Sequence, residues 1–192
     1  MTRNWQTVTI RDIGIYVQRG KSPKYAISSA LPVINQKCIR WWGVDDRHLK
    51  FIDPAQWISL APERFLRDGD IVWNSTGTGT IGRAALYRSM NGYERAVVDS
   101  HVTIVRCGPE CIPEFLHYYI RSPLIQDQIS EMHAGSTNQV ELSRDEILRT
   151  PVPLPPLDEQ RRIVTKLDGL FARSRNGRDE LAVVAPDKPD RE

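Results

Sequence analysis

The sequence predicts an α+β protein, in which a β-rich domain with packed helices is followed by a long C-terminal amphipathic helix of the coiled-coil type. Two changes of pattern along the chain predict this fold. Up to about residue 107, short runs of β-branched and aromatic residues are separated by turn residues, which is typical of strands. After Pro113, apolar residues recur every three or four positions, and from Asp158 they do so again, which is typical of helices.

The strands of the first part are short, and Gly, Pro, Asn or Asp bounds each of them. A short helix is expected between residues 54 and 65, with turns at residues 67–70 and at Asn91-Gly92. The segments predicted as strands are residues 15–18, 31–35, 49–52, 71–74 and 84–87, and one longer strand region at 96–106.

Three helices are expected before the C-terminal one. The apolar spacing predicts the first from residue 115 and the second from Pro123, a residue suited to a first helical turn. Ser143-Arg-Asp-Glu146 has the pattern of a capping box at the start of the third. The proline-rich residues 151–156 can form neither a helix nor a central strand, because alternate residues lack an N–H group, so we expect a stiff extended connector.

The C-terminal segment has apolar and small residues at alternating spacings of four and three, the a/d seam of a coiled coil. We therefore predict a domain at residues 1–155, a spacer or dimerisation helix at 156–185 and a disordered tail at 186–192. A single amphipathic helix must bury its apolar face against its own domain, another copy or a partner. The residues expected to make this contact are Ile163, Leu167, Leu170 and Leu181.

Composition limits the class of protein. A chain of 192 residues, 40% of them hydrophobic, has the material for one core plus an appendage. Three cysteines, no signal-peptide pattern and no apolar run of the roughly 20 residues that a membrane span needs predict a cytoplasmic protein with no membrane partner. The net charge is only +2, but residues 1–60 hold nine Lys and Arg against four Asp and Glu, which favours a basic face.

The stretch at residues 73–85 contains G-x-G-x-x-G at Gly77, Gly79 and Gly82, the spacing of a dinucleotide-binding loop. Such a loop must open a helix, whereas here only a short strand and another turn follow. We therefore predict a structural turn between two strands, in which the glycines permit positive φ. The residues left open as contacts to a DNA phosphate are Ser75, Thr76, Thr78 and Arg83.

No catalytic or metal site is predicted, and no cofactor. Cys107 and Cys111 form an isolated Cys-x3-Cys pair, and His101 and His117 fall on different elements, so buried thiols and histidines are favoured over zinc. The chain has no Glu/Asp-x-Lys triplet of the nuclease type and no Asn/Asp-Pro-Pro-Tyr/Phe tetrapeptide of the amino-methyltransferase type. The sequence therefore predicts a protein that is not an enzyme.

Basic, amide and aromatic residues gather in three loops, and this mixture is typical of DNA contacts. Arg and Lys bind guanine edges or phosphates, Asn and Gln bind adenine, and Tyr packs against sugars or exposed bases. The residues expected to bind DNA are Arg19, Lys21, Lys24, Tyr25, Asn35, Lys37, Arg40, Ser136, Thr137, Asn138 and Gln139.

Residues 150–168, TPVPLPPLDEQRRIVTKLD, resemble the signature that joins a target-recognition domain to the conserved spacer helix in specificity subunits of type I restriction-modification systems. Similar segments are found at residues 5–13, at 69–72 with 77–84, and at 135–139 with Leu142-Ser143, so the resemblance covers nearly the whole chain. It implies a protein without an active site that reads double-stranded DNA and places a methyltransferase subunit on one half of a bipartite target. S-adenosylmethionine would belong to that subunit, and ATP to a restriction subunit.

A full subunit of this family has two recognition domains and two spacer helices, whereas this chain has room for one domain and a shortened helix. It resembles a half subunit, or a subunit cut inside the spacer. A homodimer of halves, paired along the helix seam, would place two domains on a split palindromic site. Two alternatives stay open: a helical adaptor or regulator that binds the methyltransferase without reading DNA, and a nucleotide-binding enzyme, which the missing helix after Gly82 disfavours.

Overall fold

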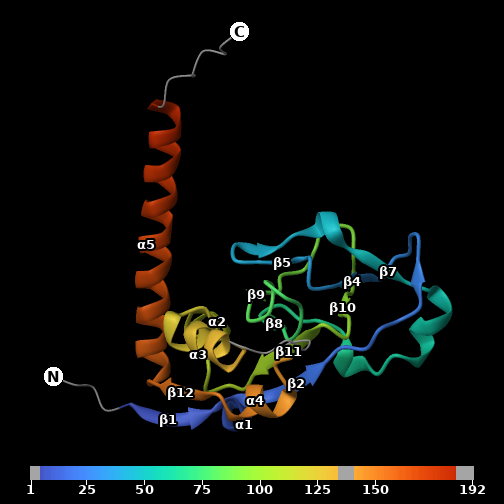
Figure 1. The fold of residues 1–192 in the computed structure, drawn as a ribbon, viewed down its shortest axis with the longest axis horizontal. Coiled ribbons are helices and arrows are strands. Elements are labelled where there is room, and N and C mark those ends of the chain that lie inside the picture. The colour runs from blue at the N-terminus through green and yellow to red at the C-terminus, as the bar shows by residue number, and fades with distance from the viewer. Residues whose placement is uncertain (1–4, 134–140, 185–192) are drawn as a thin grey trace.

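The computed structural model describes residues 5–133 and 141–184 (Figure 1). In this part of the chain, two four-stranded sheets, two two-stranded sheets and five α-helices are present, and the predicted α+β class is confirmed. The long helix α5 (Leu157–Val184) stands beside the sheets and short helices, and its C-terminal half extends beyond them (Figure 1). Among the described helices, none is long and apolar enough to cross a membrane.

The first four-stranded sheet lies at the centre of the domain. Its strands, antiparallel in this order, are β2 (Gly14–Arg19), β11 (Val102–Cys107), β8 (Ile71–Asn74) and β9 (Ala84–Leu86). Alternate side chains enter two separate hydrophobic clusters, with Ile71 and Val105 in one and Val72 and Ile104 in the other. Both faces are buried along β8 and most of β11, so these two strands appear in the sequence as mostly apolar runs, whereas β2 is only partly buried.

The second four-stranded sheet corrects one prediction. Its strands, in order, are β10 (Val97–Val98), β4 (Pro32–Ile34), β7 (Lys50–Ile52) and β3 (Tyr25–Ala26), with β10 parallel to β4 and the other pairs antiparallel. The single strand region expected at residues 96–106 is wrong, since β10 and β11 belong to different sheets. A turn separates them, in which the Val102 N–H donates to the Asp99 carbonyl at 3.2 Å.

The helices of the domain cover one face of the first sheet and follow the predicted order. They are α2 (Pro113–Ile120), α3 (Pro123–His133) and α4 (Arg144–Arg149). The capping box is formed as predicted, because the Glu146 N–H donates to Ser143 Oγ at 3.2 Å and the Ser143 N–H to Glu146 Oε2 at 2.6 Å. The short helix expected at residues 54–65 is replaced by two 3-10 helices, η2 (Pro54–Ser59) and η3 (Pro62–Arg64).

Several small elements were not predicted from the sequence. They are β1 (Gln6–Thr9), α1 (Ile10–Ile13), the hairpin of β5 (Ile39–Arg40) with β6 (Gly43–Val44), the 3-10 helix η1 (Asp46–His48), β3 and β12 (Pro151–Leu154). The proline-rich run is therefore more than a connector, since β12 pairs antiparallel with β1. A two-stranded sheet leaves each strand with an open edge, so the missing N–H groups of Pro151 and Pro153 need not interrupt a ladder.

The first turn of α5 is fixed to the domain by one buried amide. Gln160 is fully buried; its Nε2 donates to the carbonyls of Glu110 (2.9 Å) and Pro155 (2.8 Å), and its Oε1 accepts from the Ile112 N–H (2.8 Å). Further along, Phe171 stacks on Tyr118 of α2 with ring centroids 5.6 Å apart. The domain boundaries and the coiled-coil character of α5 stay predictions, and residues 186–192 lie outside the described residues.

Candidate nucleic-acid interface

Segments from both four-stranded sheets meet around Arg19, the last residue of β2. The guanidinium donates from Nε to the Ser100 carbonyl in the turn between β10 and β11, and from Nη1 to the carboxylate of Glu141. Gln36 follows β4, and the glycine loop joins β8 to β9. The structure therefore brings together segments that are up to 122 positions apart in the sequence.

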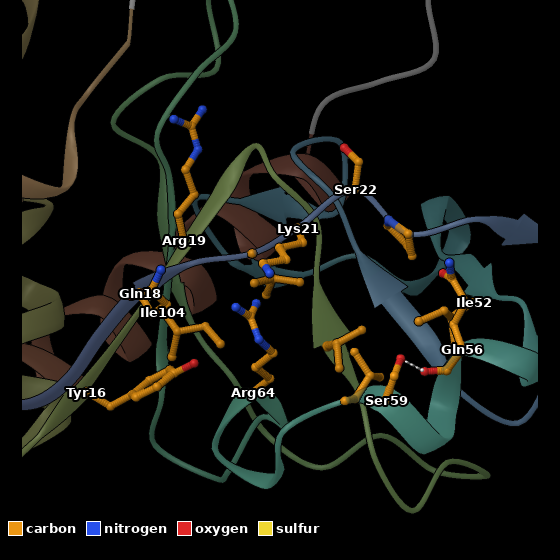
Figure 2. Close-up of a pocket in the computed structure, with 15 residues that line it drawn as sticks. Tyr16, Gln18, Arg19, Lys21, Ser22, Ile52, Gln56, Ser59, Arg64 and Ile104 are labelled. Atoms are coloured by element: carbon orange, nitrogen blue, oxygen red, sulfur yellow. Dashed lines mark hydrogen bonds between the residues drawn. The ribbon is translucent and has the colours of Figure 1, made fainter.

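Two hollows share Arg19 as a lining residue. The larger one, about 440 Å³, is lined by Arg19, Gln36, Thr76, Gly77, Thr78, Ser100, His101 and Glu141. The smaller one, about 220 Å³, has polar walls that include Lys21 and Arg64 and an apolar floor that includes Ile52 and Ile104. Figure 2 shows Arg64 and Lys21 in the smaller hollow, with the Arg19 side chain directed away from them.

Asn35 is a predicted DNA contact that the structure argues against. Only 4% of its surface is exposed, its Nδ2 donates to the His48 carbonyl at 2.7 Å, and its Oδ1 accepts from the Lys37 N–H at 2.9 Å. Both the Nδ2 and the Oδ1 of Asn35 are thus bonded to backbone groups of its own loop. Binding of Asn35 to a base would require these hydrogen bonds to break. The neighbouring Gln36, which the prediction passed over, is the amide that reaches the larger hollow.

The other predicted contacts differ in their surroundings. Lys21, Lys24 and Lys37 are exposed, and Tyr25 is 42% exposed with the Lys50 ammonium 4.4 Å above its ring. Arg40 is half-buried, with its Nε 3.6 Å from the Asp45 carboxylate. The predicted contacts Ser136, Thr137, Asn138 and Gln139 lie outside the described residues.

Asp45 organises the loop that carries Arg40. Its carboxylate is buried and accepts from Arg47 Nε and Nη2, each at 2.8 Å. The hydrogen bonds from Arg47 hold the pKa of Asp45 well below its usual range, so the carboxylate is charged at neutral pH. Part of the positive charge of this loop is therefore already neutralised, which leaves the exposed lysines as the stronger attractants for phosphate.

The glycine loop turns the chain between two antiparallel strands, and no helix follows it. Gly77, Gly79 and Gly82 have φ values of 101°, 75° and 83°, in the region that favours glycine. The loop packs against the segment after β4, because Asn74 Nδ2 donates to the Gln36 carbonyl at 3.1 Å and Thr80 Oγ1 donates to Gln36 Oε1 at 3.2 Å. The loop thereby holds the Gln36 side chain on one wall of the larger hollow.

Replacing Gly77 with alanine is expected to disturb Gln36, whereas the same change at Gly79 is expected to strain only the backbone. A Cβ at Gly77 would lie 2.0 Å from Gln36 Oε1 and 2.5 Å from Thr80 Oγ1, while nothing lies within 4 Å of one at Gly79. Both changes place alanine at positive φ, which costs about 1–2 kcal/mol. Urea unfolding should show Gly77→Ala to be the more destabilising. Equal losses of stability would mean that the packing of Gly77 against Gln36 does not contribute to stability.

The two histidines considered for a metal site have separate roles. His101 lies at the larger hollow, where its Nδ1 is 2.6 Å from Thr76 Oγ1. His117 is buried in α2 beside the Ala84 carbonyl, and burial lowers its pKa to about 4, so the ring is neutral at pH 7. Among the described residues, no three His, Cys, Asp or Glu side chains lie close enough together to hold a metal ion.

Comparison with known families agrees with this arrangement. Residues 2–182 match the family model described as type I restriction modification DNA specificity domain. The chain belongs to this family. Its specificity-domain relatives include the type I restriction enzyme EcoKI specificity subunit of Escherichia coli strain K12, 22% identical over 143 residues, which are 73% of this chain and 30% of that protein. The EcoBI specificity subunit of E. coli is 31% identical over 133 residues, 67% of this chain and 26% of that protein.

A solved structure shows the same specificity-domain fold. The HsdS subunit from Thermoanaerobacter tengcongensis superposes with a TM-score of 0.69 at 22% identity, over 95% of this chain and 46% of that one. The chain therefore spans under a third of the curated relatives it matches and about half of this solved subunit.

Proposed function

We propose that this chain is a sequence-specific DNA-recognition unit of a type I restriction-modification system. It would direct a methyltransferase subunit, and with it a restriction subunit, to one half of a bipartite target. Its own part would be binding in the cytoplasm rather than catalysis, with S-adenosylmethionine and ATP held by the partner subunits. The observation that carries the proposal is the hollow in which Arg19, Gln36, His101 and two threonine hydroxyls come together, in a chain that belongs to the specificity-domain family.

The proposed DNA contacts fall into two groups. The exposed lysines on the segments after β2 and β4 would hold phosphates, because compact ammonium groups attract the backbone without reading sequence. The side chains of the larger hollow would face the base edges. The full set is Arg19, Lys21, Lys24, Tyr25, Gln36, Lys37, Arg40, Thr78, His101 and residues 136–139.

Helix α5 offers a second contact surface, for a partner subunit or for another copy of the chain. Val164 and Ile163 pack against the domain core, so Ile163 belongs at least in part to the domain's own contact. Leu170 is 46% exposed, and Leu167 lies one turn before it on the predicted seam. We propose that Leu167 and Leu170 pack against a partner helix; the side chain of the predicted seam residue Leu181 lies outside what the structure describes. Mass measurement over a range of concentrations distinguishes a homodimer from a monomer.

Binding to duplex DNA should be salt-dependent and should weaken when three exposed lysines are neutralised. Removing one phosphate contact should reduce the slope of log K against log salt by about 0.9, so Lys21→Gln, Lys24→Gln and Lys37→Gln together should remove up to about 2.7. Fluorescence anisotropy of a labelled duplex measures this slope. The exposed Lys166 of α5 gives the control, since Lys166→Gln should leave the slope unchanged. Absence of any salt-sensitive binding would favour the helical adaptor instead.

A further inference from the structure

Two acceptors from other segments orient the guanidinium of Arg19. The Ser100 carbonyl accepts from Arg19 Nε, and the Glu141 carboxylate accepts from Arg19 Nη1. The backbone directly after Arg19 is held by the Gly20 N–H, which donates to the Val102 carbonyl at 3.0 Å. A guanidinium has five N–H donors, so these two bonds leave one donor on Nη1 and two on Nη2. The end of the guanidinium thus keeps the paired donors needed for bidentate binding.

The larger hollow carries too little positive charge to be a phosphate site. Its lining residues include one arginine and one carboxylate, Glu141, whose side chain is 53% exposed. A phosphate placed against Arg19 would also approach this carboxylate. The amide of Gln36 and the hydroxyls of Thr76 and Thr78 add both donors and acceptors. A nearly neutral wall with donors and acceptors matches base edges, which carry both kinds of group, better than it matches phosphate.

We propose that Arg19 is a specificity-determining residue that reads a guanine through its O6 and N7, with Glu141 as the positioning residue that holds it. This inference rests on the proposed DNA-recognition function, and it names one base, guanine, and the side chain that reads it, Arg19. A guanidinium matches the two guanine acceptors in one plane, whereas the ammonium of lysine is a point charge on a flexible stem. Removal of the bidentate pairing should therefore weaken the preference for guanine at that one position, while the preferences at other positions and the general attraction to DNA remain.

The test is selection of bound duplexes from a random-sequence library by the whole chain, followed by sequencing. The wild-type protein should enrich a guanine at one position, and Arg19→Lys should reduce the preference there by about 5- to 150-fold while keeping the other positions. Arg161→Lys is the matched control, because Arg161 also pairs with a carboxylate, Asp158 at 2.6 Å, but lies on α5. A guanine preference that survives in Arg19→Lys would overturn the inference.

Glu141→Gln separates positioning from a structural role. Removing a negative charge beside the DNA should tighten binding to non-specific duplex, while the less firmly held Arg19 should discriminate guanine less well. A purely structural role of Glu141 would instead weaken both, and that result would overturn its assignment. Salt-sensitive binding without enrichment of any sequence would overturn the reading role of Arg19 and leave DNA binding in place. Absence of both would contradict the proposed function itself.

Discussion

Replacing Asp70 with asparagine is expected to lower the free energy of unfolding by about 3–5 kcal/mol. Asp70 accepts from Arg106 Nε at 2.8 Å and from Arg106 Nη2 at 2.7 Å, and the two side chains are 1% and 9% exposed. Arg106 also donates to the Phe65 carbonyl at 3.0 Å and lies over the Tyr16 ring. The substitution would leave a buried guanidinium without its counter-charge, which costs far more than the loss of an exposed pair.

Urea unfolding followed by tryptophan fluorescence measures this effect. Asp68 provides the control within the same turn, because it is exposed and its Oδ1 accepts from the Ser89 N–H at 2.6 Å and from Ser89 Oγ at 2.7 Å. Asp68→Asn should cost no more than about 1 kcal/mol. If the two substitutions proved equally mild, the ion pair between β11 and the turn before β8 would not be a principal support of the first sheet.

Replacing Gln160 with leucine is the second large effect expected, a loss of at least about 3 kcal/mol in the free energy of unfolding. The change removes the partner of the Ile112 N–H and the donors to the Glu110 and Pro155 carbonyls, and each buried group left unpaired costs about 1–3 kcal/mol. Gln128→Leu on α3 is the matched control, since Gln128 is exposed. Unfolding curves and limited proteolysis at α5 measure the two variants; equal behaviour would contradict the anchoring role.

A second variant, Gln160→Glu, tests the same site through pH. A carboxyl group there would face two carbonyls that need donors, so burial should raise its pKa and favour the protonated form. The folded state would then hold the proton more tightly than the unfolded state. The stability of the variant relative to wild type, measured by urea unfolding over a range of pH, should therefore be greatest at low pH and should fall as the pH rises through the raised pKa; a difference that does not change with pH would contradict this.

The sequence predicted the larger elements because their signals are local. The capping box at Ser143 and the apolar spacing of α2 and α3 each lie within one element, and the structure has them at the predicted places. The pairing of β1 with β12 joins residues 6–9 to 151–154, and the β5–β6 hairpin has two residues in each strand. Such elements exist through tertiary contact rather than through propensity, so a local pattern does not predict them.

The sequence indicates the loops that carry the candidate site, but it does not indicate which side chains of these loops line the larger hollow. Asn35 and Gln36 are adjacent and chemically similar, but their amides have different partners. The Asn35 Nδ2 donates to the His48 carbonyl, whereas the Gln36 Oε1 accepts from Thr80 Oγ1. His48 lies 13 positions from Asn35, and Thr80 lies 44 positions from Gln36, so neither contact belongs to a local sequence pattern. The pairing of Arg19 with Glu141 likewise depends on the fold, and no spacing in the sequence indicates it.

The residues that line the larger hollow lie outside the buried core of the domain. None of five residues that line it is buried: Arg19, Gln36, Thr78, His101 and Glu141. Substitutions at surface positions of this kind usually change stability by no more than about 0.5 kcal/mol. Under the proposed function, substitutions in this hollow can therefore change the DNA target while the scaffold stays folded.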